Sequence, residues 1–211
     1  EAIVAATPLP VSGDFENGYA EAPDGVAETI RRAASVGLSG CSIEDTYFSG
    51  GAAVAYDFAL TVERSRAAVA AARAVGRPFI LCARADGVLQ GCYDLAEAIR
   101  RVRAFEAAGA DLLYVPVPPG VAELKQVLAA VKGPVNALAA GPLRNLSVAE
   151  FAALGVRRIS LGSQVARVTH AVIRDRMREM LGDGSFKGLL GAAPGDDRLR
   201  RAPAPVSADA R

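Results

Sequence analysis

The stretch that decides the fold is YDLAEAIRRVRAFEAAGADLLYVPV, residues 93–117, in which a helical pattern ends at Gly109 and a short apolar run follows. Apolar residues recur at helical spacing in the first part, whereas residues 111–117 are compact and apolar, as a strand buried on both faces of a sheet requires. Glycine is a typical stop signal for a helix. The stretch therefore predicts one helix-strand unit of a parallel sheet.

The same alternation extends along the chain on both sides of this stretch. Strands are predicted at residues 9–15, 38–44, 77–84, 111–117, 133–139 and 157–162. The segments between them have helix start and stop signals, and helices are predicted at residues 23–37, 56–76, 93–109, 120–133, 147–155 and about 163–181. Six such units fit either an open doubly wound α/β sheet or a (β/α)8 TIM-type barrel of which two units lie outside this chain.

The two ends of the chain carry less regular patterns. Residue 1 is Glu1 rather than Met, and EAIVAAT, residues 1–7, is typical of the end of a helix that leads into the first strand. We therefore expect residues 1–190 to form a barrel domain that is incomplete at its N-terminus, with about two βα units of roughly 30 residues each outside the chain. The alternative is a chain that naturally begins there. Residues 191–211 are rich in Pro, Ala and charge, and are predicted to form a disordered tail.

Composition excludes several classes of partner. The 211 residues are 51% hydrophobic and 22% charged, which is typical of a soluble globular protein. Lys and Arg number 24 and Asp and Glu 23, so the net charge of +1 gives no broad basic surface for nucleic acid or an anionic membrane. The chain has neither an apolar run of about 20 residues nor the pattern of a signal peptide. We expect a cytoplasmic protein that binds neither nucleic acid nor membranes.

The cysteines do not suggest a disulfide framework or a thiolate metal site. Cys41, Cys82 and Cys92 are an odd number of residues with no CxxC spacing. Cys41 and Cys82 also lie within apolar runs. We therefore predict reduced thiols, buried in the case of these two.

Acidic side chains follow the first two predicted strands. Asp14 and Glu16 end the first strand, and because side chains of an extended segment alternate with a period of two, both carboxylates are expected to face one ligand. Glu44 and Asp45 end the second strand at the same rim. A divalent cation, Mg²⁺ or Mn²⁺, would neutralise these hard oxygen ligands. The alternative is that the acids cap the following helices or pair with surface arginines, and for Asp45 this alternative has at least equal weight.

Arg84 ends the third predicted strand, two residues before Asp86. Its planar guanidinium can hold a substrate carboxylate or phosphonate opposite a cation. It can also pair with Glu44 or Asp86 and hold the strand ends together. The two roles are compatible.

Further polar residues near the strand ends give weaker signals. Tyr19, Tyr47 and Tyr56 flank the acidic rim and could donate protons, although packing is the commoner role of such tyrosines. Tyr47 belongs to TYFSGGAAVAY, residues 46–56, whose Ser and paired Gly predict a mobile loop that can close over a ligand. Asn136, within the fifth predicted strand, could hydrogen-bond a ligand or the local backbone.

Three of these segments occur in a recognisable order, PVSGDFENGY at residues 10–19, GLSGCSIEDT at 37–46 and LCARADG at 81–87. They resemble the PV…D-x-D-x-G-[YF], G-[IV]-x-G-x-x-[IL]-E-D and A-R-x-[DE] segments of the isocitrate lyase and phosphoenolpyruvate mutase superfamily. The match continues through AIRRVRAFEAAGADLLYVP, PVNALA and GVRRISLGS. The resemblance covers roughly residues 9–190.

The resemblance implies a magnesium-dependent barrel that makes or breaks a C–C or P–C bond of a small 2-oxo acid through an enolate-like intermediate. In this reading Asp14, Glu16 and Glu44 match the metal-site carboxylates, some acting through water, and Arg84 matches the substrate-binding arginine. The resulting candidates are Arg84 and Tyr47 for catalysis, and Arg84, Asn136 and Tyr19 for binding of a 2-oxo-acid or phosphonate substrate. The family also implies a homo-oligomer, a dimer or a tetramer.

The chain departs from the family pattern in three places. Residues 46–55 contain no Cys, His or Lys, so the K-[KR]-C-G-H motif of the lyases is absent. The strand that reads YVPVP lacks the histidine of the mutases, and the family's first two strands have no counterpart. These departures disfavour isocitrate lyase, methylisocitrate lyase and phosphonate mutase activities, and leave a lyase, decarboxylase or hydrolase of a small 2-oxo acid. Two alternatives stay open: a degenerate homologue that binds a 2-oxo acid without reacting, and an unrelated phosphate-binding barrel that uses Gly141 and Gly162.

Overall fold

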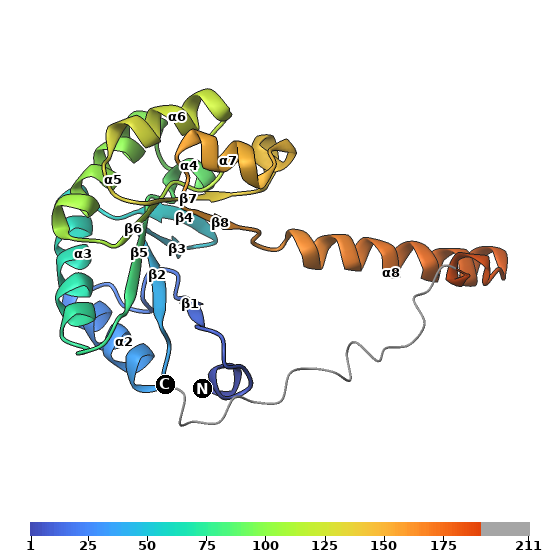
Figure 1. Ribbon diagram of the computed structural model, residues 1–211, viewed down its shortest axis with the longest axis horizontal. Helices are drawn as coiled ribbons and strands as arrows, with labels where there is room; N and C mark the ends of the chain where they lie inside the picture. Colours follow the sequence, from blue (N-terminus) through green and yellow to red (C-terminus); the bar gives the residue numbers. More distant parts are fainter. Residues whose placement is uncertain (191–211) are drawn as a thin grey trace. The chain divides into compact units, whose positions relative to one another are not determined.

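The structure, a computed structural model, describes residues 1–190 (Figure 1). The chain divides into two compact units. The first comprises Glu1–Ser160 and the second begins at Leu161. The first unit contains the sheet and all the predicted site residues.

All six predicted strands are present in the first unit. They are β1 (Ser12–Asp14), β2 (Gly40–Glu44), β5 (Ile80–Arg84), β6 (Leu112–Tyr114), β7 (Val135–Leu138) and β8 (Arg158–Ser160). They form one parallel sheet in which the strand order follows the chain, β1-β2-β5-β6-β7-β8. In a TIM-type barrel each strand lies next to the preceding strand of the sheet, always on the same side of it. In a doubly wound sheet the strand order reverses direction at one point. The fold is therefore the α/β barrel type, and the open doubly wound alternative is excluded.

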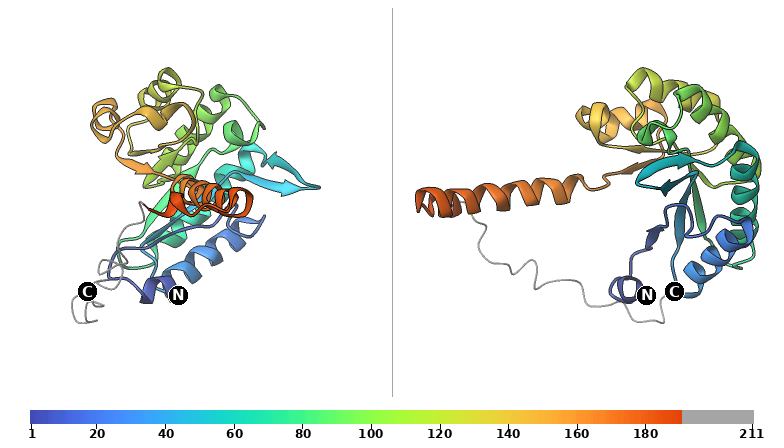
Figure 2. Two further views of the ribbon diagram at one scale, coloured as in Figure 1. Left: turned by 90° about the vertical axis from the view of Figure 1, so that its right-hand side faces the viewer. Right: turned by 180° about the vertical axis from the view of Figure 1, so that it is seen from behind.

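Helices cover the outer face of this curved sheet (Figures 1 and 2). These helices are α2 (Pro23–Ser35), α3 (Phe58–Arg73), α5 (Leu95–Ala108), α6 (Val121–Ala130) and α7 (Val148–Leu154). The first unit also contains three short helices, α1 (Ala2–Ala5), α4 (Gly87–Gln90) and the 3-10 helix η1 (Gly141–Asn145). Their start signals act as expected, because the Asp57 and Asp94 carboxylates accept hydrogen bonds from the first backbone amides of α3 and α5. Glycines in the left-handed conformation end α5 and α7.

The two faces of the sheet differ in chemistry because side chains alternate along each strand. On β2, Cys41 and Ile43 belong to the apolar core that the sheet shares with α2 and α3. Ser42, on the opposite face, donates a hydrogen bond to Asp14. Burial raises the pKa of the Cys41 and Cys82 thiols to about 12, so both stay protonated at neutral pH. The prediction of buried, reduced thiols is confirmed for these two.

One row of the sheet carries most of the polar side chains of the inner face. Glu44 is in register with Arg84, Arg84 with Tyr114, Tyr114 with Asn136, and Asn136 with Arg158. Residues in register on parallel strands point to the same side of the sheet. The row therefore brings three charged groups, one phenol and one amide from five strands to the inner face.

Residues 46–56 do not form the predicted loop. They form an antiparallel hairpin, β3 (Thr46–Ser49) and β4 (Ala52–Ala55), joined by Gly50 and Gly51. The φ angles of these glycines are 58° and 82°, and positive φ at both positions is the requirement of a tight hairpin turn. A Gly-Gly pair between β-forming residues specifies a tight turn, so the segment is a regular hairpin, and its mobility and its closure over a ligand stay predictions.

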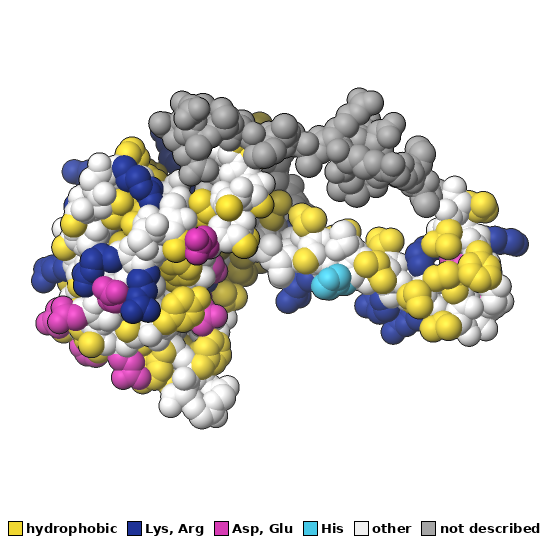
Figure 3. Space-filling view, turned by 90° about the horizontal axis from the view of Figure 1, so that it is seen from below, with side chains coloured by type: hydrophobic (Ala, Val, Ile, Leu, Met, Phe, Trp, Pro, Cys, Tyr) yellow, Lys and Arg dark blue, Asp and Glu magenta, His cyan; other side chains and the backbone are white. Residues whose placement is uncertain are grey.

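The second unit contains α8 (Gln164–Asp183) and the 3-10 helix η2 (Lys187–Leu189). No residue of α8 is buried, and apolar side chains lie exposed along it (Figure 3). They include Val165, Val168, Val172, Ile173, Met177 and Leu181. The tail predicted at 191–211 lies outside the described residues. Among the helices of residues 1–190, none is both long and apolar enough to cross a membrane.

Candidate functional site

The ends of β1, β2 and β5 bring three carboxylates to one guanidinium. Arg84 Nη1 lies 2.9 Å from Asp14 Oδ1, Nη2 lies 3.1 Å from Glu44 Oε2, and Nε lies 2.8 Å from Asp86 Oδ1. The Arg84 side chain is only 13% exposed. The prediction that Arg84 pairs with Glu44 or Asp86 is confirmed, and Asp14 is a third partner.

The cluster carries more negative than positive charge. Burial, followed by the Asp86 carboxylate, raises the pKa of Glu44 to about 7, while Arg84 opposes the shift and Asp14 and Glu16 add to it. Burial alone would lower the pKa of Arg84, but its hydrogen bond to Asp86 and the surrounding carboxylates raise it. Arg84 therefore stays charged, yet does not offset all the negative charge around Glu44.

Glu16 reaches the site by a route that differs from the predicted one. β1 ends at Asp14, and Glu16 has a φ of 47°, so the extended geometry that would have aligned the two carboxylates does not reach Glu16. The carbonyl of Glu16 accepts a hydrogen bond from the Glu44 amide at 2.7 Å. Glu16 and Glu44 both line a cavity of about 260 Å³, here called the acid pocket, whose other lining residues are Asn17, Glu21, Thr46, Tyr47 and Phe48.

The predicted metal-binding carboxylates are divided between these two features. Asp14 lies against Arg84, Glu16 lies in the acid pocket, and Glu44 belongs to both. Within residues 1–190, no group of three or more His, Cys, Asp and Glu side chains forms a ready-made metal cluster. The donor type is nevertheless that preferred by Mg²⁺ and Mn²⁺. Burial is the main cause of the raised pKa of Glu44, and the neighbouring carboxylates, whose charge a cation would offset, add to it. The set fits a divalent cation in donor type and charge.

The buried Asp45, which follows Glu44 in the chain, connects the end of β2 to three neighbouring groups. Its carboxylate, 2% exposed, accepts hydrogen bonds from the Asp86 amide at 2.8 Å, the Tyr93 hydroxyl at 2.7 Å and Arg101 Nη1 at 2.9 Å. The alternative reading of Asp45 as the partner of an arginine holds, but Arg101 is 5% exposed and is not the surface arginine that this reading assumed. Tyr93 and Arg101 were missed from the sequence, where Arg101 is one of three arginines within residues 95–108. The available signal was its position on the apolar, sheet-facing side of that helix.

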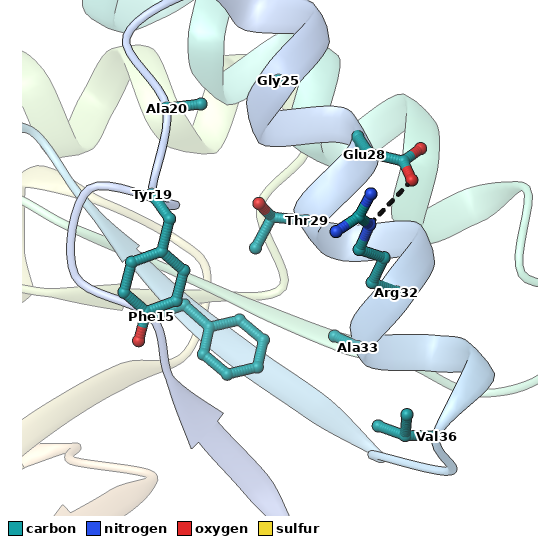
Figure 4. A pocket seen from close by; sticks show the side chains of 9 residues that line it. All are labelled: Phe15, Tyr19, Ala20, Gly25, Glu28, Thr29, Arg32, Ala33 and Val36. Atoms are coloured by element: carbon teal, nitrogen blue, oxygen red, sulfur yellow. Dashed lines mark hydrogen bonds and ion pairs between the residues drawn. The ribbon is translucent and has the colours of Figure 1, made fainter.

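The candidate tyrosines lie in different cavities. Tyr47 lines the acid pocket, and its ring stacks on that of Tyr56 with the ring centroids 4.6 Å apart. Tyr19 is 66% exposed and lines a separate cavity of about 520 Å³ between the turn after β1 and α2, where its ring packs against Phe15 (Figure 4). The structure therefore brings Tyr47, but not Tyr19, to the carboxylates.

Asn136 lies on the inner face, in the same row as Arg84. Its side chain is 1% exposed, and Nδ2 donates to Ser160 Oγ at 2.9 Å. Its Oδ1 accepts from Arg158 at 3.5 Å. The amide is thus engaged by β8, and its predicted role in substrate binding stays a prediction.

Comparisons with known proteins give a consistent picture. A family model described as phosphoenolpyruvate phosphomutase matches residues 1–181. An oxaloacetate decarboxylase of Paraburkholderia xenovorans (strain LB400) is 32% identical over 180 residues, which are 83% of this chain and 58% of the decarboxylase. The chain spans about half the length of the curated relatives it matches.

Solved structures show the same fold. A Burkholderia cenocepacia J2315 protein designated a lyase/mutase superposes with a TM-score of 0.86 at 44% identity, covering 93% of this chain and 70% of that one. A 2,3-dimethylmalate lyase superposes with a TM-score of 0.72 at 28% identity, covering 90% of this chain and 63% of the lyase. The shared part contains the sheet and its covering helices.

Proposed function

Because the chain belongs to the phosphoenolpyruvate phosphomutase family, within the isocitrate lyase and phosphoenolpyruvate mutase superfamily, we propose that it is part of a magnesium-dependent lyase that cleaves a C–C or P–C bond of a small 2-oxo acid. The observation that carries the proposal is the pairing of Arg84 with Asp14, Glu44 and Asp86 beside the acid pocket. Mn²⁺ is an alternative cation. The names of the relatives, an oxaloacetate decarboxylase and a dimethylmalate lyase, favour C–C cleavage.

Asp14, Glu16 and Glu44 are the residues that would hold the cation. When bound, it would act as a Lewis acid that stabilises negative charge on an enolate oxygen. Glu44 is the central member, because it is 8% exposed and belongs both to the Arg84 cluster and to the acid pocket. Its loss should therefore affect both features.

Arg84 is the proposed substrate-binding residue. Of its three partners Asp14 is the most exposed, with 66% of its side chain accessible, whereas Glu44 and Asp86 are 8% and 0% exposed. Exposed ion pairs contribute little to stability, so the contact with Asp14 is the one that exchanges at the lowest cost. Release of Asp14 would leave the Nη1 edge of the guanidinium free to bind a substrate carboxylate.

Tyr47 is the proposed proton donor. It lies in the hairpin that replaces the lyase motif, and residues 46–55 offer no Cys, His or Lys for this role. Its ring is held against Tyr56 at the wall of the acid pocket. A phenol in this place can protonate a carbanion or enolate formed beside Glu44.

The test is turnover by the full-length protein with Mg²⁺ on oxaloacetate, related 2-oxo acids and phosphonopyruvate, with products identified by mass spectrometry. We expect cleavage of at least one of the C–C substrates and its loss in Glu44→Ala. A protein that binds these acids in calorimetry but converts none of them would refute the lyase and favour the non-catalytic 2-oxo-acid-binding alternative. The expected homo-oligomer can be measured on the same sample by light scattering.

A further inference from the structure

Arg64 of α3 is a buried cation whose partners are backbone atoms. It is 2% exposed and forms no ion pair with any residue in 1–190. Its guanidinium donates hydrogen bonds to three carbonyl oxygens, those of Asn17, Ala20 and Glu21. A buried charge is unfavourable unless it is well bonded, so these carbonyls must be held in place for Arg64 to be tolerated.

The three carbonyls belong to the turn that shapes one wall of the acid pocket. Residues 15–21 carry Glu16 and Tyr19 at φ angles of 47° and 53°, a region that residues other than glycine rarely adopt. Such conformations persist only where the surroundings hold them, and they are common at functional sites. Arg64, which is more than 40 residues away in the chain, supplies this support.

The same guanidinium also contacts Tyr56, whose ring stacks on a residue that lines the pocket. Its central carbon lies 4.1 Å from the centroid of the Tyr56 ring, and that ring stacks on Tyr47 of the hairpin. The Tyr56 hydroxyl accepts a hydrogen bond from Asn17 Nδ2 at 2.8 Å. Arg64 and Tyr56 thus join the turn that carries Glu16 to the hairpin that carries Tyr47.

We propose that Arg64 is a positioning residue of the acid pocket, which fixes Glu16 through the backbone of the turn and Tyr47 through the ring of Tyr56. The proposal rests on the proposed function, because positioning matters only if the pocket holds a cation and a reacting substrate. Replacement of the Arg64 guanidinium should leave the sheet intact. It should increase the separation between the turn that carries Glu16 and the hairpin that carries Tyr47. The consequence is weaker cation binding rather than loss of the fold.

The first test is Mn²⁺ binding to the full-length protein, measured by calorimetry. Arg64→Met should weaken binding by about tenfold to 100-fold, as expected for a residue that orients a metal ligand. Arg64→Lys, which keeps the charge but not the planar guanidinium, should recover part of the loss. Arg66→Met, at an exposed position of the same helix, should stay within about twofold of the wild type. A folded Arg64→Met variant with wild-type affinity would overturn the proposal.

Tyr56→Phe serves if Arg64→Met does not fold, since it removes only the hydroxyl that binds Asn17. It should weaken Mn²⁺ binding by roughly threefold to tenfold, and wild-type affinity would count against the proposal.

Amide hydrogen exchange without metal separates this inference from the proposed function. Arg64→Lys should accelerate exchange in both residues 15–21 and 46–56 relative to Arg66→Met, because both segments lose the same support. Unchanged exchange in either segment would overturn the inference. If the wild-type protein itself binds no Mn²⁺, the cation of the proposed function is refuted, and exchange alone decides the role of Arg64.

Discussion

Two sectors of one sheet carry different chemistry: a charged sector at the ends of β1, β2 and β5, and a second sector at β7 and β8. In the charged sector, the partly buried Arg84 holds three carboxylates beside a cavity. In the second sector, Arg158 occupies the same row of the sheet as Arg84. Within residues 1–190, its one side-chain hydrogen bond is a 3.5 Å contact to Asn136, an uncharged amide. The backbone offers equivalent positions on every strand of a barrel, so the location of the site is decided by the side chains and not by the fold.

The largest expected difference between the two sectors comes from removing each arginine. Arg84→Met leaves three carboxylates near one another without their shared cation, and should lower the free energy of unfolding by about 3 to 5 kcal/mol. Arg158→Met, in the same row, should change it by less than about 0.5 kcal/mol. Urea unfolding of both variants measures the difference. An equal decrease in the free energy of unfolding in both variants would show that the two sectors do not differ.

Loss of the buried ion pair between Asp45 and Arg101 should lower the free energy of unfolding nearly as much. Asp45→Asn leaves the buried Arg101 without one of its carboxylate partners, and should cost about 3 kcal/mol. Glu97→Gln removes the other partner of Arg101, a side chain that is 25% exposed, and should cost less than about 1 kcal/mol. Thermal or urea unfolding gives the comparison. If Glu97→Gln were the more damaging, the buried pair would not be the main support.

Substitution of one tyrosine in each of the two cavities tests which cavity belongs to the active site. Tyr47→Phe should reduce kcat about 100-fold while the protein stays folded, because it removes the proposed proton donor. Tyr19→Phe, in the cavity beside α2, should leave kcat within about twofold of the wild type. The reverse order of effects would move the chemistry away from the acid pocket.

The smallest effect is expected at Asn136, in the second sector. Asn136→Ala removes the hydrogen bond to Ser160 and should lower the free energy of unfolding by about 1 kcal/mol. If the role of Asn136 is structural, KM should not change. A selective rise in KM without loss of stability would instead support the predicted role of Asn136 in substrate binding.

The sequence predicts the strands well because each is a short apolar run followed by polar residues, a local signal that packing does not reverse. Asp14, Glu44 and Arg84 were found for the same reason, since they end such runs. The orientation of Glu16 was not predictable in this way. Its φ of 47° belongs to a turn held by Arg64, a contact between residues far apart in the chain.

The supporting arginines show the same limit. Arg64 and Arg66 are indistinguishable in the segment TVERSRAAV, and only packing separates the buried one from the exposed one. The role of Arg101 likewise depends on its contact with Asp45, which lies 56 residues earlier in the chain. The hairpin at residues 46–56 was missed for a different reason, because its Gly-Gly turn is a local signal that also fits a loop.

The central claim is that the charged sector is a cation-dependent site, and calorimetric titration of Mn²⁺ into the full-length protein tests it most directly. We expect one site per chain in the wild type and in Asn136→Ala, and a loss of affinity of about 100-fold in Glu44→Gln. Equal binding by the wild type and Glu44→Gln, or no binding by either, would contradict the claim.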